Sequence, residues 1–199
     1  MQQRAILKNG LQLLRKHGFT LLMGIAAVVL FVSPGAKSWT LRQLMRTGLF
    51  NASMEKEAPA APAVDFAFED GNGNLQHTSS LRGKVVFINF WASWCPPCRA
   101  EFPSIESLYG QFKNDPGIFF LTINEDDNAS AAFDYLQKEQ FTVPFYKASG
   151  RVPAEVYSGT LPTTVVLDKQ GRIRFHHTGF ANYDSEKFVQ QVEALIREN

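Results

Sequence analysis

The sequence has little cysteine and almost no net charge. Only two cysteines occur in 199 residues, and both lie in the tetrapeptide Cys95-Pro96-Pro97-Cys98. A secreted scaffold stapled by disulfides needs more cysteines, spread along the chain, which argues against a purely stabilising role for this pair. The formal net charge is +1, so electrostatics give no reason to expect nucleic acid as a partner.

Charged residues are absent from a stretch near the N-terminus. Residues 17–36 contain no Asp, Glu, Lys or Arg, and a run of about 20 such residues is long enough to cross a bilayer as a helix. Residues 1–16 carry basic side chains and no acid, which predicts a cytoplasmic N-terminus and export of the rest. We expect a basic cytoplasmic segment at 1–16 and a transmembrane signal-anchor at 17–36, embedded in the lipid bilayer of the inner membrane. The alternative is a cleaved signal peptide and a soluble periplasmic protein.

Residues 37–63 are expected to connect this anchor to a folded domain. Leu41, Leu44 and Met45 share one helical face, so the first part is either a plain juxtamembrane stalk or a short helix on the membrane surface. Residues 58–63 consist only of Ala and Pro, as in a semi-rigid linker. The domain boundary is placed there, with the folded domain at 64–199.

The pattern of apolar residues in the domain predicts an α/β fold. The expected elements are a β-hairpin at 64–68 and 75–78, a buried strand at 84–90, a helix starting at the cysteine pair, a strand at 118–123, a helix at 129–140, a hairpin at 163–167 and 172–176, and a helix at 185–197. This order predicts a mixed central sheet with helices on both faces. Parallel strands end at one edge of a sheet, where ligand sites lie, so the cysteines should neighbour residues 124–128.

A Cys-x-x-Cys motif at a strand-to-helix junction favours redox chemistry. Cys95 would lie at the helix N-terminus, where free N–H groups and the helix dipole stabilise a thiolate. It is expected to be the exposed nucleophile, with Cys98 one turn on as the resolving thiol, and no cofactor is needed. A structural zinc site would need further ligands, which the sequence does not supply nearby. A c-type haem would need His after Cys98, where the chain has Arg99.

Residues 89–99, Asn-Phe-Trp-Ala-Ser-Trp-Cys-Pro-Pro-Cys-Arg, resemble the active-site segment of TlpA/ResA-type thioredoxin-like proteins. The similarity extends from about Val64 to the C-terminus. Proteins of this type are membrane-anchored periplasmic disulfide reductases, and some prepare apocytochrome c for haem. The resemblance therefore implies a thioredoxin-like fold, a protein disulfide as substrate, and a membrane electron donor that re-reduces the dithiol.

The resemblance also implies roles for residues outside the cysteine pair. Pro103 matches the proline that kinks this helix in thioredoxins. Leu161 and Pro162 match the cis-proline loop, which packs against the cysteines and lends backbone groups to the substrate, although the sequence leaves the isomer open. Trp94 would contribute to the substrate contact surface beside Cys95, together with the two prolines of the motif, Pro96 and Pro97.

One position departs from thioredoxins themselves, which carry a buried Asp six residues before the first cysteine. This chain has Asn89 there, and an amide cannot accept the proton. Glu101 matches a glutamate of the TlpA/ResA branch that is thought to serve instead. The alternative is an ordinary solvated helix glutamate.

The direction of electron flow is expected to be reducing. Pro96 and Pro97 have no N–H, so the loop offers the Cys95 thiolate few donors, and a less stabilised thiolate makes a poorer oxidant. Three rival functions stay open: a DsbA-like oxidase, a peroxiredoxin and a Cu(I)-binding module. A peroxiredoxin would want Thr where the chain has Ala92. Acidic residues 125–127 are expected to be a solvated loop and helix cap, with a lesser chance of selecting partners.

Overall fold

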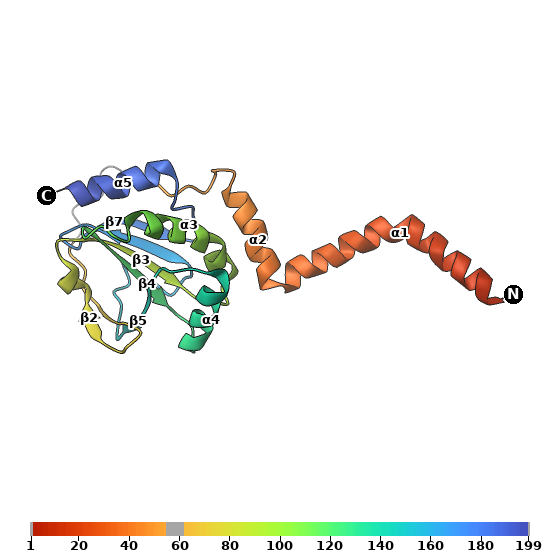
Figure 1. Ribbon diagram of the computed structural model, residues 1–199, viewed down its shortest axis with the longest axis horizontal. Helices are drawn as coiled ribbons and strands as arrows, with labels where there is room; N and C mark the ends of the chain where they lie inside the picture. The colour runs from red at the N-terminus through yellow and green to blue at the C-terminus, as the bar shows by residue number, and fades with distance from the viewer. Residues whose placement is uncertain (1, 55–61, 199) are drawn as a thin grey trace. The chain divides into compact units, whose positions relative to one another are not determined.

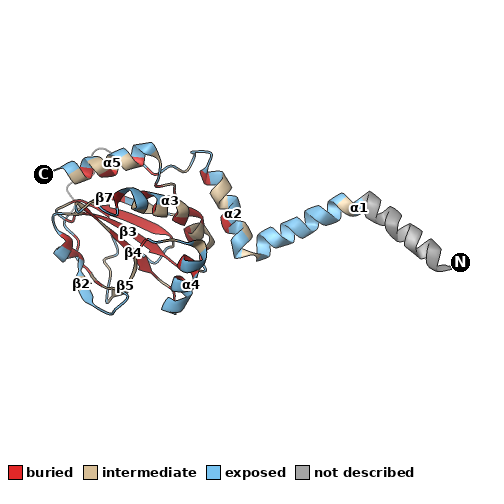
Figure 2. Cartoon of the chain, viewed as in Figure 1, coloured by how far each residue is buried: buried red, intermediate tan, exposed pale blue. Residues whose placement is uncertain are grey.

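A computed structural model describes residues 2–54 and 62–198. For residues 2–16 it describes the backbone only. The chain divides into two compact units, Met1–Lys37 and Ser38–Asn199. In the first unit, α1 (Gln2–Val32) is one long helix whose apolar side chains from Phe19 to Val32 are exposed (Figure 2). Among the described residues, no single helix is both long and apolar enough to cross a membrane. The segments His17–Val32 and Pro34–Met45 reach that length and hydropathy only together, as a bent pair.

The second unit is built on one seven-stranded sheet (Figure 1). Its strands are β1 (Ala67–Glu69), β2 (Leu75–His77), β3 (Val85–Trp91), β4 (Ile118–Asn124), β5 (Phe145–Ser149), β6 (Thr163–Leu167) and β7 (Ile173–Thr178). Their order in the sheet is β2-β1-β5-β4-β3-β6-β7. β3, β4 and β5 pair in parallel, and the remaining pairs are antiparallel. The mixed sheet predicted from the sequence is therefore confirmed.

Local signals in the sequence set where the helices begin. The second unit contains the end of α2 (Pro34–Met45), the short 3-10 helix η1 (Thr78–Leu81), α3 (Pro96–Phe112), α4 (Ala129–Glu139) and α5 (Glu186–Arg197). Pro96 and Pro97 occupy the first positions of α3, where no helical N–H is needed. Asn128, rather than Asp127, caps α4 by accepting from the Ser130 N–H at 3.0 Å.

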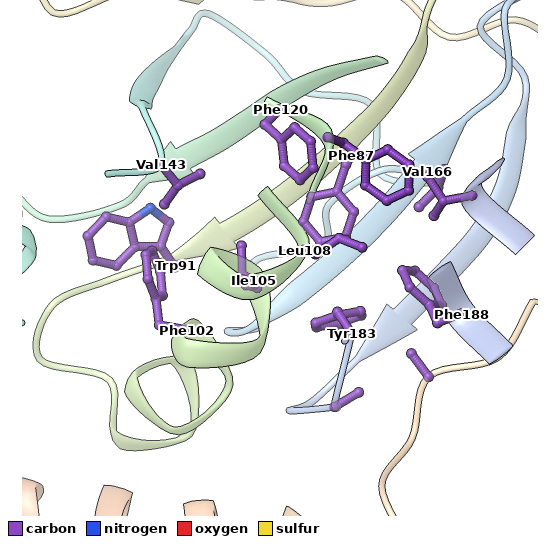
Figure 3. Packing of buried hydrophobic residues seen from close by; sticks show 14 of the residues in the cluster. Phe87, Trp91, Phe102, Ile105, Leu108, Phe120, Val143, Val166, Tyr183 and Phe188 are labelled. Atoms are coloured by element: carbon purple, nitrogen blue, oxygen red, sulfur yellow. The ribbon is translucent and has the colours of Figure 1, made fainter. Parts of the chain in front are cut away.

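The expectation of helices on both faces of the sheet is wrong for the three long helices of the domain. Buried side chains of α3, α4 and α5 all belong to one apolar cluster, together with Phe87 and Trp91 of β3. Figure 3 shows Trp91 beside Phe102 of α3, and Tyr183 close to Phe188 of α5. The reason is topological: β3, β4 and β5 lie in sequence order across the sheet, so two right-handed crossovers put α3 and α4 on the same face.

The other face of the sheet is covered by shorter segments. Its cluster contains Phe90 of β3, Leu81 of η1, and residues from two irregular stretches, Val64–Phe66 and Val152–Tyr157. The stacked rings of Phe90 and Tyr157, with centroids 4.2 Å apart, show how closely the second stretch covers this face. The domain therefore has helices on one side of the sheet and mostly loops on the other.

Two features of the second unit differ from the sequence analysis. β5 was not expected, because its residues are only half-buried and show no alternation of buried and exposed positions. The compact unit also begins at Ser38 rather than Val64. Residues 50–54 lie against the end of the domain, where Gln191 bonds both backbone groups of Met54 at 2.9 and 2.7 Å. Most of the predicted Ala/Pro linker, residues 58–61, lies outside the described residues.

Candidate active site

The two cysteines form a disulfide at the start of α3, with their Cα atoms 5.3 Å apart. Cys95 is the N-cap residue, and its Sγ accepts a hydrogen bond from the Cys98 N–H at 3.3 Å. Cys98 has no exposed surface and Cys95 exposes only 3%. The expectation of an exposed Cys95 is therefore corrected for the disulfide form: Cys95 is the more accessible of the two, but it is nearly buried.

The sheet brings the proline loop to the cysteine pair. Thr163, the first residue of β6, lies opposite Phe90 near the end of β3, so Leu161 and Pro162 lie at the edge from which α3 departs. The Leu161–Pro162 peptide is cis. Pro162 is buried, and Leu161 packs against the apolar cluster that contains both cysteines. The two segments singled out in the sequence analysis are thus brought together.

The aromatic and proline residues around the disulfide divide between core and surface. Trp91 has no exposed surface, whereas Trp94 is 62% exposed. Pro96 and Pro97 are half-buried. Trp94 and the two prolines are therefore accessible to a molecule approaching Cys95, as a substrate contact surface requires.

Glu101 is buried in a polar network beneath the disulfide-bearing turn. It has no exposed surface, which excludes the solvated-glutamate alternative. Its Oε1 accepts from the Asn89 amide at 2.8 Å, and its Oε2 accepts from the backbone N–H of Ala181 at 3.2 Å. The Asn89 amide also donates to Thr164 Oγ1 at 2.9 Å. The network joins α3 to β3, to β6 and to the loop after β7.

Burial raises the pKa of Glu101 from its ordinary value to about 8, although the hydrogen bonds from Asn89 and Ala181 oppose the rise. The buried phenol of Tyr183 has its pKa raised as well, first by burial and then by the nearby Glu101. A carboxyl group with a pKa near 8 is close to the ordinary pKa of a thiol, about 8.5. It can therefore exchange a proton with a thiol at neutral pH at little energetic cost.

Asp126 departs from the expectation that residues 125–127 form a solvated loop. It is buried, and its carboxylate accepts from the Ser93 backbone N–H and hydroxyl at 3.1 Å and from the Asn124 amide at 2.9 Å. The neighbouring Glu125 N–H bonds to the Trp91 carbonyl at 2.8 Å. The end of β4 thus holds the loop that leads into Cys95. In the sequence, only the position of Asp126 at the predicted active edge pointed to a role near the cysteines.

Metal binding has no support in the part of the chain that the structure describes. There, no group of three or more His, Cys, Asp and Glu side chains is placed to hold a metal ion. His176 is exposed and His177 half-buried on β7, and His77 is exposed on β2.

Known proteins share this arrangement of fold and motif. The sequence model of the AhpC/TSA family matches residues 59–176. The thiol-disulfide oxidoreductase ResA of Halalkalibacterium halodurans is 32% identical over 136 residues, covering 68% of this chain and 75% of that protein. The Bacillus subtilis ResA is 31% identical, covering 61% of this chain and 68% of that protein.

A solved structure leads to the same group of proteins. A Chlorobium tepidum protein assigned as the thiol:disulfide interchange protein DsbE superimposes with a TM-score of 0.57 and is 31% identical. The match covers 70% of this chain and 98% of that one. The curated relatives and the structural neighbour thus agree on thiol–disulfide exchange, and the family match is consistent with their thioredoxin-like fold.

Proposed function

Because the chain belongs to the AhpC/TSA family and is a thiol–disulfide oxidoreductase, we propose that it reduces disulfides in other proteins, on the periplasmic side of a membrane to which α1 anchors it. The observation that carries the proposal is the Cys95–Cys98 pair at the start of α3, with the buried carboxyl of Glu101 about one helical turn after Cys98. The apoprotein of a c-type cytochrome is the substrate we favour, because the TlpA/ResA branch that the motif resembles includes proteins with that role.

In the proposed reaction the reduced pair gives two electrons to a substrate disulfide. The Cys95 thiolate attacks one substrate sulfur, the substrate S–S bond breaks, and the other substrate sulfur leaves as a thiolate. The Cys98 thiolate then attacks Cys95 Sγ, which releases the second substrate thiolate and leaves the Cys95–Cys98 disulfide. A membrane electron donor must afterwards return two electrons and two protons to the pair.

Glu101 is proposed to accept the Cys98 proton during the second step. Cys98 is fully enclosed, and burial disfavours its thiolate, so the resolving thiol needs a base more than Cys95 does. Asn89 cannot be that base, but it donates to Glu101 at 2.8 Å and holds the carboxyl group in place. The raised pKa of Glu101, about 8, fits a group that takes this proton near neutral pH.

The direction of the reaction rests on the first turn of α3. Cys95 Sγ accepts from the Cys98 N–H, while the two residues between them are prolines and have no N–H to offer. We expect a reduction potential nearer that of thioredoxin, about −270 mV, than that of DsbA, about −120 mV. Equilibration with glutathione measures it. A value above about −150 mV would reassign the protein as an oxidase.

A peroxiredoxin activity is not favoured, although AhpC/TSA names the family. Ala92 lies three residues before Cys95 and has no hydroxyl, whereas a peroxiredoxin would want Thr there. The Cys98→Ser variant separates the substrates, because it should retain its partner as a mixed disulfide on Cys95. Recovery of an apocytochrome c in this form would support the proposed substrate. If the reduced wild type consumed hydrogen peroxide faster than it exchanged disulfides, the proposed disulfide-reductase function would be contradicted.

We base the membrane location on the exposed apolar surface of α1 from Phe19 to Val32 and on the basic residues earlier in the same helix. A reporter active only outside the cytoplasm, fused after Asn199, should be active and remain with the membrane fraction. Release of a shortened, soluble protein would indicate a cleaved signal peptide instead.

A further inference from the structure

Arg42 of α2 contacts the helix that carries the cysteines. Its Nε and Nη2 both donate to the backbone carbonyl of Arg99, at 3.2 and 2.9 Å. Nη2 also lies 3.4 Å from Glu139 Oε2 at the end of α4. The guanidinium is half-buried, so this contact is shielded from water more than an ordinary surface ion pair is.

The carbonyl that Arg42 contacts is one that α3 itself cannot satisfy. In an α-helix the carbonyl of Arg99 would accept from the N–H of residue 103. That residue is Pro103, which has no N–H. A carbonyl left without a partner in a half-buried place destabilises the fold. Arg42 supplies two donors where the helix supplies none.

The contact lies one residue beyond Cys98 and adds positive charge there. Arg99 itself lies 4.0 Å from Glu139 Oε1 and stacks 5.0 Å from the centre of the Tyr135 ring. Burial raises the pKa of Tyr135 to about 12, so its phenol is neutral. Two guanidinium groups therefore lie beside the carboxylate of Glu139 near the first turns of α3, while the carboxylate of Asp126 holds the loop before Cys95 from the end of β4. The charge on Arg42 has the sign that stabilises a thiolate.

We propose that Arg42 is a positioning residue of the redox site, whose guanidinium replaces the hydrogen bond that Pro103 removes from α3 and favours the Cys95 thiolate of the reduced pair. The inference rests on the proposed thiol–disulfide function and deepens it. It makes the segment that follows α1 a part of the redox site.

The first test uses Arg42→Gln in the full-length reduced protein and follows alkylation of Cys95 against pH. Loss of a charge at a helix N-terminus should slow alkylation below the thiol pKa by about two- to fivefold. The same loss should lower the reduction potential against glutathione by about 10 to 20 mV, since tenfold corresponds to about 30 mV. Arg42→Lys, which keeps the charge but not the two-pronged donor, should recover part of both effects.

Arg46→Gln is the matched control, because Arg46 follows α2 directly, is exposed, and its guanidinium bonds only to Gln43 among the contacts described. It should leave both measurements unchanged. If Arg42→Gln is indistinguishable from Arg46→Gln while the wild type exchanges disulfides with glutathione, the inference is overturned and the proposed function stands. If the wild type itself does not exchange, the proposed function fails first.

A double-mutant cycle tests the link to Pro103. Pro103→Ala restores an N–H to the Arg99 carbonyl, so the helix should then satisfy that carbonyl itself. In this background Arg42→Gln should change the free energy of unfolding by less than half of its effect in the wild type. An equal effect in both backgrounds would show that Arg42 does not act through the carbonyl.

Discussion

Glu101 places a carboxyl group out of contact with solvent, where it is held by the Asn89 amide and the Ala181 N–H. Each of these donors favours the ionised form, yet burial outweighs them and the pKa rises to about 8. The group is therefore mostly protonated at neutral pH and lies near its titration midpoint in mildly alkaline solution. Its ionised fraction can accept the Cys98 proton, and the raised pKa itself makes the stability of the fold depend on pH.

Replacing Glu101 by Gln keeps the size and hydrogen bonding of the side chain but removes proton acceptance. We expect resolution of a mixed disulfide on Cys95 to slow by about ten- to hundredfold, because Cys98 loses its base. Stopped-flow release of a labelled peptide thiol measures this step. Alkylation of Cys95 in the reduced protein should change much less. Equal turnover in variant and wild type across pH 6 to 9 would show that Glu101 accepts no proton in the reaction.

The raised pKa of Glu101 also makes stability depend on pH. In the unfolded chain the carboxyl has its ordinary pKa of 4.5, whereas in the folded protein it keeps its proton up to about pH 8. Between these values the folded state binds more protons, so the free energy of unfolding falls as pH rises. The slope from this group approaches about 1.4 kcal/mol per pH unit.

Denaturant unfolding of the oxidised wild type and Glu101→Gln, at pH 5.5 and 8.5, isolates this contribution because the disulfide removes thiol titration. The wild type should lose stability over this interval, and the variant should lose clearly less. Parallel losses in the two proteins would mean that the folded-state pKa of Glu101 is close to the unfolded one.

At the scale of secondary-structure elements, the site depends on where strands end. Parallel pairing of β3 with β4 brings the loop after Trp91 beside Asn124–Asp126, and antiparallel pairing of β3 with β6 brings Pro162 to the same edge. These three segments lie far apart in the sequence. The sheet is therefore what assembles the site, and the buried Asp126 fastens one of its loops.

Asp126→Ala should destabilise the protein by about 1 to 3 kcal/mol, because the half-buried Ser93 N–H and hydroxyl lose their buried acceptor. The rate at which glutathione or dithiothreitol reduces the disulfide should fall by a smaller factor than the equilibrium constant for folding does. The substitution moves a loop and removes no reacting group. Urea unfolding and reduction kinetics measure the two effects. Asp127→Ala, at the exposed neighbour, is the control, and a similar destabilisation by both variants would contradict the role assigned to Asp126.

At the scale of the whole molecule, the catalytic domain reaches further toward the N-terminus than its sequence pattern indicates. Ala52 and Met54 are buried in the cluster that contains the cysteines. The Ala52 N–H bonds to the Asn182 carbonyl at 2.9 Å, and Gln191 holds Met54 by two bonds. The segment before the predicted linker is thus part of the folded domain.

A fragment spanning 38–199 should therefore unfold at a higher denaturant concentration than one spanning 64–199. Burial of the Met54 side chain alone contributes about 1.5 to 3 kcal/mol. A fragment spanning 48–199 separates the two contributions, because it keeps residues 50–54 but lacks α2. If the 64–199 fragment is as stable as the longest one, residues 50–54 add nothing to the fold.

The sequence by itself determined the features that depend on neighbouring residues. The start of α3 follows from Cys95-Pro96-Pro97-Cys98, the burial of β3 follows from its unbroken apolar run, and the Asp70–Asn74 turn follows from its glycines and asparagines. These are local preferences, and they were enough to predict the redox pair, the mixed sheet and the order of most elements. β5 escaped because a half-buried strand carries no periodic pattern.

Only the tertiary structure decided the surroundings of the redox pair. The resemblance pointed to Glu101, but its burial depends on Asn89, 12 residues away, and on Ala181, 80 residues away. The Arg42–Arg99 contact spans 57 residues and the Ser93–Asp126 contact spans 33. The right-handedness of two successive crossovers placed α3 and α4 on the same face of the sheet. Partners so distant in sequence meet only when the whole sheet has formed, because it is the sheet that fixes their separation in space.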